Sequence, residues 1–90
     1  MSETCMLEDV FSSKGRVRVI RVLAKAEELN ISEIARRANL NYRATNNHLK
    51  ALRNAGLIQE KRFGRVRIFR FKSENTKALA LKQLVEAWET

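Results

Sequence analysis

The sequence predicts a mostly α-helical domain that carries one β-hairpin, an α+β fold class. Three observations predict it. Apolar residues recur every three or four positions in several stretches, which is the period of an amphipathic helix. Residues 57–71 instead alternate in part, are rich in aromatic and β-branched side chains, and surround Gly64, as a hairpin does. The chain has 90 residues, 44% of them hydrophobic, so we expect residues 1–90 to form one domain with its own core.

Two helices are expected in the first third of the chain. The first lies within residues 1–11, and the second covers residues 14–28. The apolar face of the first helix consists of Met6, Leu7, Val10 and Phe11. The buried stripe of the second helix consists of Val17, Ile20, Leu23 and Ala24. This spacing favours a helix over a strand, although β-branched residues are frequent here.

A shorter helix and a turn are expected next. Residues 29–31 interrupt the helical pattern, either as a break or as one short strand. Ser32 is expected to cap a helix that ends near residue 38, because a serine hydroxyl can accept from the free N–H groups of the first turn. Residues 39–41 then form a turn whose leucine, Leu40, enters the core.

Asn41 is expected to cap the following helix, over residues 42–55, and Gly56 to end it in the left-handed conformation. Helical spacing divides this helix into two faces. The inner face consists of Thr45, Leu49 and Leu52, with His48 at its margin. The outward face consists of Tyr42, Arg43, Asn46, Asn47 and Lys50.

The end of the chain is expected to form the hairpin and a last helix. The two strands cover residues 57–63 and 65–71, and Gly64 is the tip. Ser73 or Asn75 caps a helix that runs to about residue 89. Its apolar seam consists of Ala78, Leu81, Leu84, Val85 and Trp88.

Positive charge is concentrated in the middle of the chain. The formal net charge is +8, and eleven of the 18 lysines and arginines lie between Arg36 and Lys72. The same window contains one acid, Glu60. A polyanion such as DNA is the natural partner of this charge distribution. The alternative is a surface made basic for solubility, which does not account for the clustering.

Helix, helix, turn, helix and hairpin together make a winged helix-turn-helix. The segments KGRVRVIRVLA from Lys14, ISEIARRANLNYRATNNHLKALRNAGLI from Ile31 and GRVRIFRF from Gly64 resemble the ArsR/MarR-type transcriptional regulators of bacteria and archaea. The resemblance covers residues 13–71, and HLKALRNAGLI from His48 is its most specific part. It implies a DNA-binding regulator of transcription.

The helix over residues 42–55 is the expected reader of DNA. In a helix-turn-helix the second helix enters the major groove with its N-terminal residues leading. Arginine suits guanine and asparagine suits adenine at the base edges found there. We therefore expect Tyr42, Arg43, Asn46, Asn47 and Lys50 to contact DNA. The alternative is an ordinary solvated face, but that face would be richer in good helix formers.

The hairpin, over residues 58–71, is the expected wing. Arg62, Arg65 and Arg67 flank Gly64, so we expect three guanidinium groups near the tip. They suit phosphates or a narrow minor groove. The alternative, charge that protects an exposed strand edge from aggregation, is compatible with that role.

The flanking segments, residues 1–12 and 73–90, are expected to dimerise, as they do in the family that the sequence resembles. A homodimer would read two half-sites about one helical turn apart. The expected interface consists of Leu81, Leu84, Val85 and Trp88, aided by Met6, Leu7 and Val10. The alternative is that the seam completes the core of the monomer.

Enzymatic activity is not expected, because the sequence holds no phosphate loop, no nucleophile with a matched base and no clustered carboxylates. No cofactor is expected. Cys5 is the one cysteine and His48 the one histidine, which departs from the metal sites of many ArsR-type sensors, so no metal is expected. His48 is expected to be a packed, hydrogen-bonded residue.

No apolar run approaches the length of a membrane span, and the first residues lack the basic start of a signal peptide. We therefore expect a cytoplasmic protein associated with the nucleoid and not with membranes. Two other functions remain open from the sequence. One is an architectural protein that coats DNA without a preferred site, and the other is a winged helix used for protein interaction.

Overall fold

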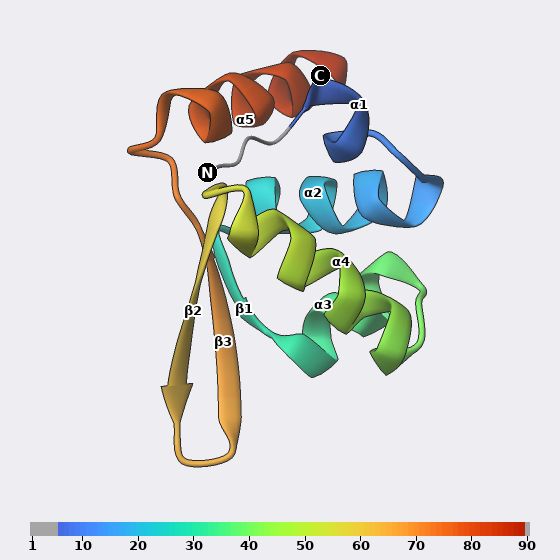
Figure 1. Cartoon of the computed structure of the whole chain (residues 1–90), viewed down its shortest axis with the longest axis vertical. Helices are drawn as coiled ribbons and strands as arrows, with labels where there is room; N and C mark the ends of the chain where they lie inside the picture. The colour runs from blue at the N-terminus through green and yellow to red at the C-terminus, as the bar shows by residue number, and fades with distance from the viewer. Residues whose placement is uncertain (1–5, 90) are drawn as a thin grey trace.

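Five helices and a three-stranded sheet make up the fold of the described residues. The computed structural model describes residues 6–89 (Figure 1). In chain order the elements are α1 (Leu7–Val10), α2 (Lys14–Ala26), β1 (Glu28–Asn30), α3 (Ile31–Ala38), α4 (Tyr42–Asn54), β2 (Ile58–Phe63), β3 (Val66–Phe71) and α5 (Thr76–Trp88). The mostly helical class with a hairpin wing is confirmed. Of the first expected helix, residues 1–5 lie outside the described part of the chain.

Polar side chains begin four of the helices. The Ser13 Oγ accepts from the N–H of Arg16 at 3.1 Å to start α2, and the Asn41 Oδ1 accepts from Ala44 at 2.7 Å to start α4. Such caps satisfy N–H groups that have no partner within the helix. Of the two expected caps of α5, Ser73 and Asn75, the structure has Asn75.

The expected cap of α3 was wrong. Asn30, not Ser32, begins this helix, and its Oδ1 accepts from the N–H of Glu33 at 2.8 Å. The helix therefore starts two residues earlier than expected, at Ile31, and that residue is buried. Asparagine and serine are both good caps, so cap preference alone could not choose between Asn30 and Ser32. The start at Asn30 places Ile31 in the first turn, where it is buried.

The second helix ends two residues earlier than expected. Glu27 has a φ of 72°, outside the helical region, and its carbonyl accepts from the N–H of Phe71 at 2.8 Å. Residues 28–30 can then pair with β3 as an antiparallel strand. This pairing joins distant parts of the chain, so the spacing of apolar residues within one stretch cannot predict it.

The sheet has the order β1-β3-β2, so β3 is its central strand. Leu29 of β1 and Glu60 of β2 both lie opposite Phe69. Arg62 lies opposite Arg67, and Gly64 turns the hairpin with a φ of 62°. The two expected strands are confirmed to within one residue at their starts.

Figure 1 shows how these elements present the hairpin. Helix α4 crosses in front of α2 and α3, the β2–β3 hairpin projects away from the helices, and α5 lies at the opposite end beside α1. The core between them includes the buried residues Val19, Leu23, Ile34, Leu49, Ile58, Phe69, Phe71 and Ala78. Leu40 packs against this core, as expected. None of the described helices is long and apolar enough to cross a membrane.

Candidate nucleic-acid interface

Helix α4 has the two faces that its spacing predicts. The inner residues Thr45, Leu49 and Leu52 are buried, and the Thr45 hydroxyl is satisfied because it donates to the carbonyl of Asn41 at 2.8 Å. The outward residues remain accessible to solvent. Tyr42, Arg43, Asn47 and Lys50 are exposed, and Asn46 is half-buried.

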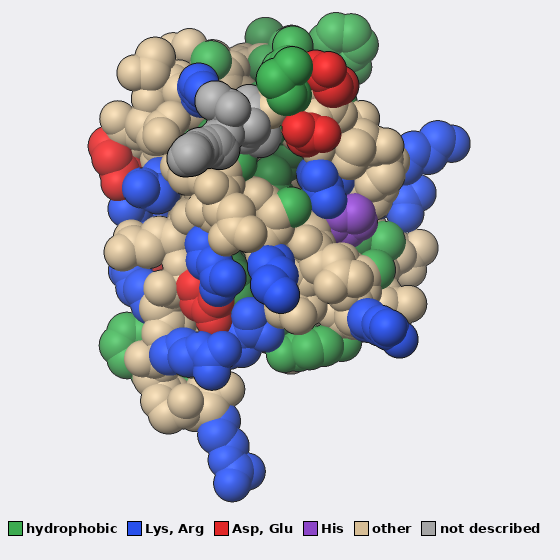
Figure 2. Space-filling view, in the orientation of Figure 1, with side chains coloured by type: hydrophobic (Ala, Val, Ile, Leu, Met, Phe, Trp, Pro, Cys, Tyr) green, Lys and Arg blue, Asp and Glu red, His purple; other side chains and the backbone are tan. Residues whose placement is uncertain are grey.

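The face that carries α4 and the hairpin is strongly cationic. Figure 2 shows lysine and arginine side chains spread over this face, with one acidic group between them, while hydrophobic side chains gather at the end near α1 and α5. The hairpin projects beyond the helices beside α4 (Figure 1). A polyanion that approaches this face could therefore contact α4 and the hairpin at the same time.

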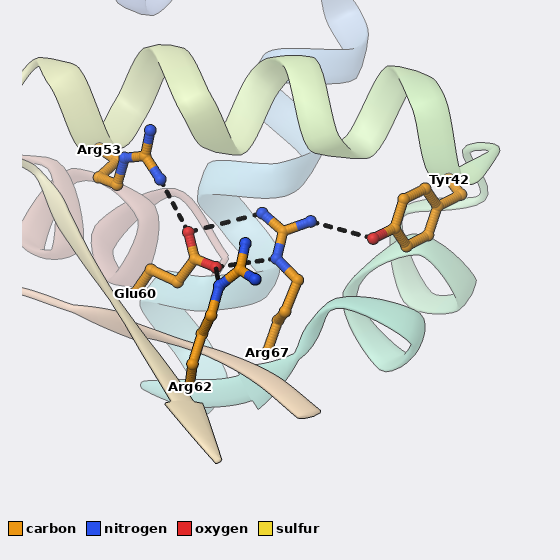
Figure 3. Close-up of polar contacts among 5 residues, drawn as sticks. All are labelled: Tyr42, Arg53, Glu60, Arg62 and Arg67. Atoms are coloured by element: carbon orange, nitrogen blue, oxygen red, sulfur yellow. Dashed lines mark hydrogen bonds and ion pairs between the residues drawn. The ribbon is translucent and has the colours of Figure 1, made fainter. Parts of the chain in front are cut away.

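Glu60 of β2 is the centre of an arginine cluster that joins the hairpin to α4 (Figure 3). Its carboxylate accepts from Arg53 Nη1 at 2.8 Å, Arg62 Nε at 3.1 Å and Arg67 Nε at 2.8 Å. Its side chain is only 7% exposed. The hydrogen bond from Arg67 is the main reason that the pKa of Glu60 lies below its ordinary value, and the bonds from Arg62 and Arg53 add to it.

Arg62 and Arg67 both turn toward Glu60 (Figure 3), and Arg67 differs because its guanidinium also reaches Tyr42 and is more enclosed. Its Nη1 donates to the hydroxyl of Tyr42 at 3.0 Å, its Cζ lies 5.3 Å from the ring centre of Phe69, and its side chain is 18% exposed. Arg62 is 66% exposed, although it also contacts Glu60. Arg65 is exposed next to Gly64. The three arginines expected together at the tip are therefore divided: Arg65 lies at the tip, whereas Arg62 and Arg67 contact Glu60.

His48 is packed and hydrogen-bonded, as expected. Its Nδ1 accepts from Arg16 Nε at 3.3 Å, which places the ring proton on Nε2 in the neutral form. Burial is the main cause of its lowered pKa, and the charge of Arg16 lowers it further. Arg16 also donates to the carbonyl of Asp9 at 2.7 Å, so it connects the end of α1 to α4.

Arg36 and Arg37, at the end of α3, share one carboxylate. Both pair with Glu33, Arg37 through Nε at 2.9 Å. The hydrogen bond from Arg36, followed by the bond from Arg37, lowers the pKa of Glu33 to about 2. A single negative charge thus neutralises part of the positive charge here.

The apolar seam of α5 has two parts. Leu81 and Val85 are buried against the domain, which is what the monomer-core alternative expects. Leu84 and Trp88 remain 46% and 83% exposed. They border hollows that are also lined by Phe11 of the α1–α2 connection. The exposed part is available for contact with another molecule.

Sequence reasoning did not predict the roles of Glu60, Arg16 and Gly15. A signal existed for Glu60, since an acid that stands alone in a basic window calls for an explanation. Gly15 lies so close to α4 that an added Cβ would meet His48 Nε2 at 2.8 Å. Within residues 6–89 no three His, Cys, Asp or Glu side chains form a group that could hold a metal ion.

Comparisons with known proteins agree with this geometry. The family model described as "Bacterial regulatory protein, arsR family" matches residues 13–60, just over half of the chain. HlyU from Vibrio cholerae N16961 superposes with a TM-score of 0.77 at 22% identity, over 92% of this chain and 87% of that chain. No curated protein sequence matches the chain.

Two further solved structures are similar. The AntR antimony-specific transcriptional repressor has a TM-score of 0.74 at 20% identity, over 88% of this chain and 69% of that chain. The ArsR family transcriptional regulator RHA00566 has a TM-score of 0.63 at 21% identity, over 98% of both chains. At such identities the similarity of these structures shows the winged helix-turn-helix fold.

Proposed function

Because the chain belongs to the arsR family of bacterial regulatory proteins, we propose that it is a sequence-specific regulator of transcription that binds double-stranded DNA as a homodimer. The observation that carries the proposal is the outward face of α4. It holds an arginine and two asparagines that are not buried, on a helix whose opposite face is anchored in the core. A rigid element with polar tips of this kind is suited to reading base edges.

In this proposal α4 lies in the major groove. Arg43 and Asn47 are exposed near its N-terminal end, where helix-turn-helix proteins contact bases. Tyr42, Asn46 and Lys50 complete the DNA-contacting set. The wing contacts the backbone or the minor groove, with Arg65 as its outermost guanidinium and Arg62 beside it. Arg67 supports the wing from within, because its guanidinium is engaged by Glu60 and Tyr42.

The homodimer in this proposal uses the exposed part of the α5 seam. Trp88 and Leu84 are large apolar side chains that a soluble monomer would leave in water. Leu81 and Val85 support them from below. Two copies of one 90-residue winged helix would double the number of phosphate contacts and would read two half-sites.

Binding measurements on variants test the division of labour between helix and wing. Asn46→Ala should change the order of preference among duplexes, because it removes a base-reading amide. Arg65→Glu should weaken binding to every duplex by a similar factor, because it acts on phosphates. Equal losses from both variants on every sequence would refute this division.

The affinity ratio between a selected site and random DNA separates the proposed function from its alternatives. A regulator should prefer its site by about 10³-fold or more. A ratio near one would indicate an architectural protein that coats DNA. Failure to bind any duplex at low salt would indicate a protein-interaction module.

A further inference from the structure

We propose that Glu60 is a specificity-determining residue of DNA binding. Its carboxylate holds arginines that would otherwise face DNA phosphates, and through Arg67 it positions Tyr42 at the start of the reading helix. The inference rests on the proposed function, since it assigns a role within DNA recognition. Glu60 would itself contact no base.

The charge of Glu60 opposes the binding of a polyanion. Glu60 is the one acid between Arg36 and Lys72, and it lies in the strand that forms the wing. A negative charge beside a DNA-binding face weakens attraction to phosphates. Its side chain is only 7% exposed, so it also carries a desolvation cost. Glu60 therefore lowers affinity for DNA and costs desolvation free energy, so we expect its contribution to be to specificity and not to affinity.

Two of the three arginines that contact Glu60 can exchange it for another partner. Arg62 and Arg53 are each well exposed, and each makes one hydrogen bond to Glu60. Either guanidinium can turn from the carboxylate to a phosphate without unpacking the domain. Arg67 is enclosed and bonds Glu60 through both Nε and Nη2. It therefore stays with Glu60 while the other two are shared between Glu60 and DNA.

Tyr42 is held by the same cluster. The hydroxyl of this residue accepts from Arg67 Nη1 at 3.0 Å, and Tyr42 is the first residue of α4 (Figure 3). Glu60, Arg67 and Tyr42 form a chain of contacts from the wing to the leading end of the reading helix. A side chain fixed before DNA arrives loses less conformational freedom on binding its preferred site.

Two separable effects follow. The charge of Glu60 lowers affinity for all sequences, because its arginines are partly neutralised. The position of Tyr42 affects the preferred sequence alone. Replacing Glu60 should therefore raise affinity for random DNA and reduce the preference for the selected site.

The test compares Glu60→Gln with Glu8→Gln, which removes the same charge from an exposed acid of α1 that forms no ion pair among the described residues. Log affinity for a random duplex is measured against log salt. Glu60→Gln should steepen the slope by about 0.9 per freed arginine, which is roughly a threefold change between 50 and 200 mM salt. Glu8→Gln should leave the slope unchanged. An unchanged slope in Glu60→Gln, or an equal change in both variants, would overturn the first effect.

A double-mutant cycle tests the second effect. Tyr42→Phe removes the hydroxyl and should lower the ratio of selected-site to random-site affinity without changing the salt slope. In Glu60→Gln the same tyrosine change should lower the ratio much less, because the contact is already lost. Additive losses would overturn the link through Arg67. A wild-type ratio near one would refute the proposed function, whereas the salt slopes would still report on Glu60.

A second pair of variants serves if Glu60→Gln does not fold. Arg62 is paired with Glu60, whereas no carboxylate of the described residues forms an ion pair with Arg65. Arg62→Gln should therefore reduce the salt slope clearly less than Arg65→Gln does. Equal reductions would mean that Glu60 does not withhold Arg62 from phosphates, which would contradict the proposal.

Discussion

Arg16 donates a hydrogen bond from Nε to the Nδ1 of His48 at 3.3 Å, which joins the first turn of α2 to the middle of α4. The same guanidinium reaches the carbonyl of Asp9 at 2.7 Å. Helix α4 is thereby connected to α1, which lies beside α5 (Figure 1). Because the acceptor is a neutral imidazole, this connection depends on pH.

His48→Asn should flatten the dependence of stability on pH. The folded chain holds His48 neutral with a pKa below the ordinary 6.5, so the unfolded chain binds more protons as the pH falls. The stabilising contribution is complete above 6.5 and is lost as the pH falls through the folded pKa. Asparagine keeps an acceptor near the Nδ1 position and does not titrate.

The measurement is the free energy of unfolding by urea between pH 7.5 and pH 5. Wild type should lose more stability than His48→Asn over this range. Carboxylates elsewhere titrate in both proteins and cancel in the comparison. Parallel pH profiles would show that His48 is not held neutral by its surroundings.

Gly15→Ala should destabilise the domain, although the same change within a helix usually stabilises by about 0.5–1 kcal/mol. The new Cβ would lie 2.8 Å from His48 Nε2 and 3.5 Å from a methyl of Leu40. Overpacking of this kind costs about 1–3 kcal/mol. In a His48→Ala background the clash is absent, so Gly15→Ala should there become stabilising. Urea unfolding of wild type, the two single variants and the double variant measures the effect of Gly15→Ala in each background. An increase in stability in the wild-type background would contradict the close packing.

Arg67→Gln should destabilise the domain, whereas Arg65→Gln should not. Arg67 is the main partner of the partly enclosed Glu60 carboxylate, which keeps Arg53 and Arg62 when Arg67 is replaced, so the loss should cost about 1–3 kcal/mol. Arg65 is exposed at the tip, so its loss should stay within about 0.5 kcal/mol. Thermal unfolding of the two variants at equal salt makes the comparison. Similar melting temperatures would contradict the inward role of Arg67.

Trp88→Ser together with Leu84→Ser should give a folded monomer. Both side chains are exposed, so their replacement removes apolar contact area of the proposed dimer without opening the core. Leu81→Ala, at a buried position, should instead cost about 2–5 kcal/mol of folding stability. Sedimentation at micromolar concentration reports the mass. A wild-type monomer under those conditions would refute the dimer.

The sequence predicted those features that depend on local patterns. The faces of α4, its cap at Asn41, its end at Gly56 and the hairpin around Gly64 all follow from residue spacing and backbone preference. Features that depend on pairing between distant segments were not predictable in this way. A short strand was one of the two alternatives for residues 29–31, but its pairing and the early end of α2 both require β3 to lie beside residues 28–30.

The direction of long charged side chains was also beyond the sequence. The position of Arg67 in the hairpin indicated a contact with DNA. Its guanidinium turns inward because the partly enclosed carboxylate of Glu60 and the hydroxyl of Tyr42 are both within reach. Competition among several partners decides such orientations, and those partners come together only in the fold.

Selection of bound sites from a library of random duplexes tests the central claim most directly. A dimeric reader should enrich one sequence with two similar half-sites about one helical turn apart, and the Asn46→Ala variant should enrich a different one. Recovery of duplexes without any shared sequence, from a protein that binds DNA at low salt, would contradict base reading by α4.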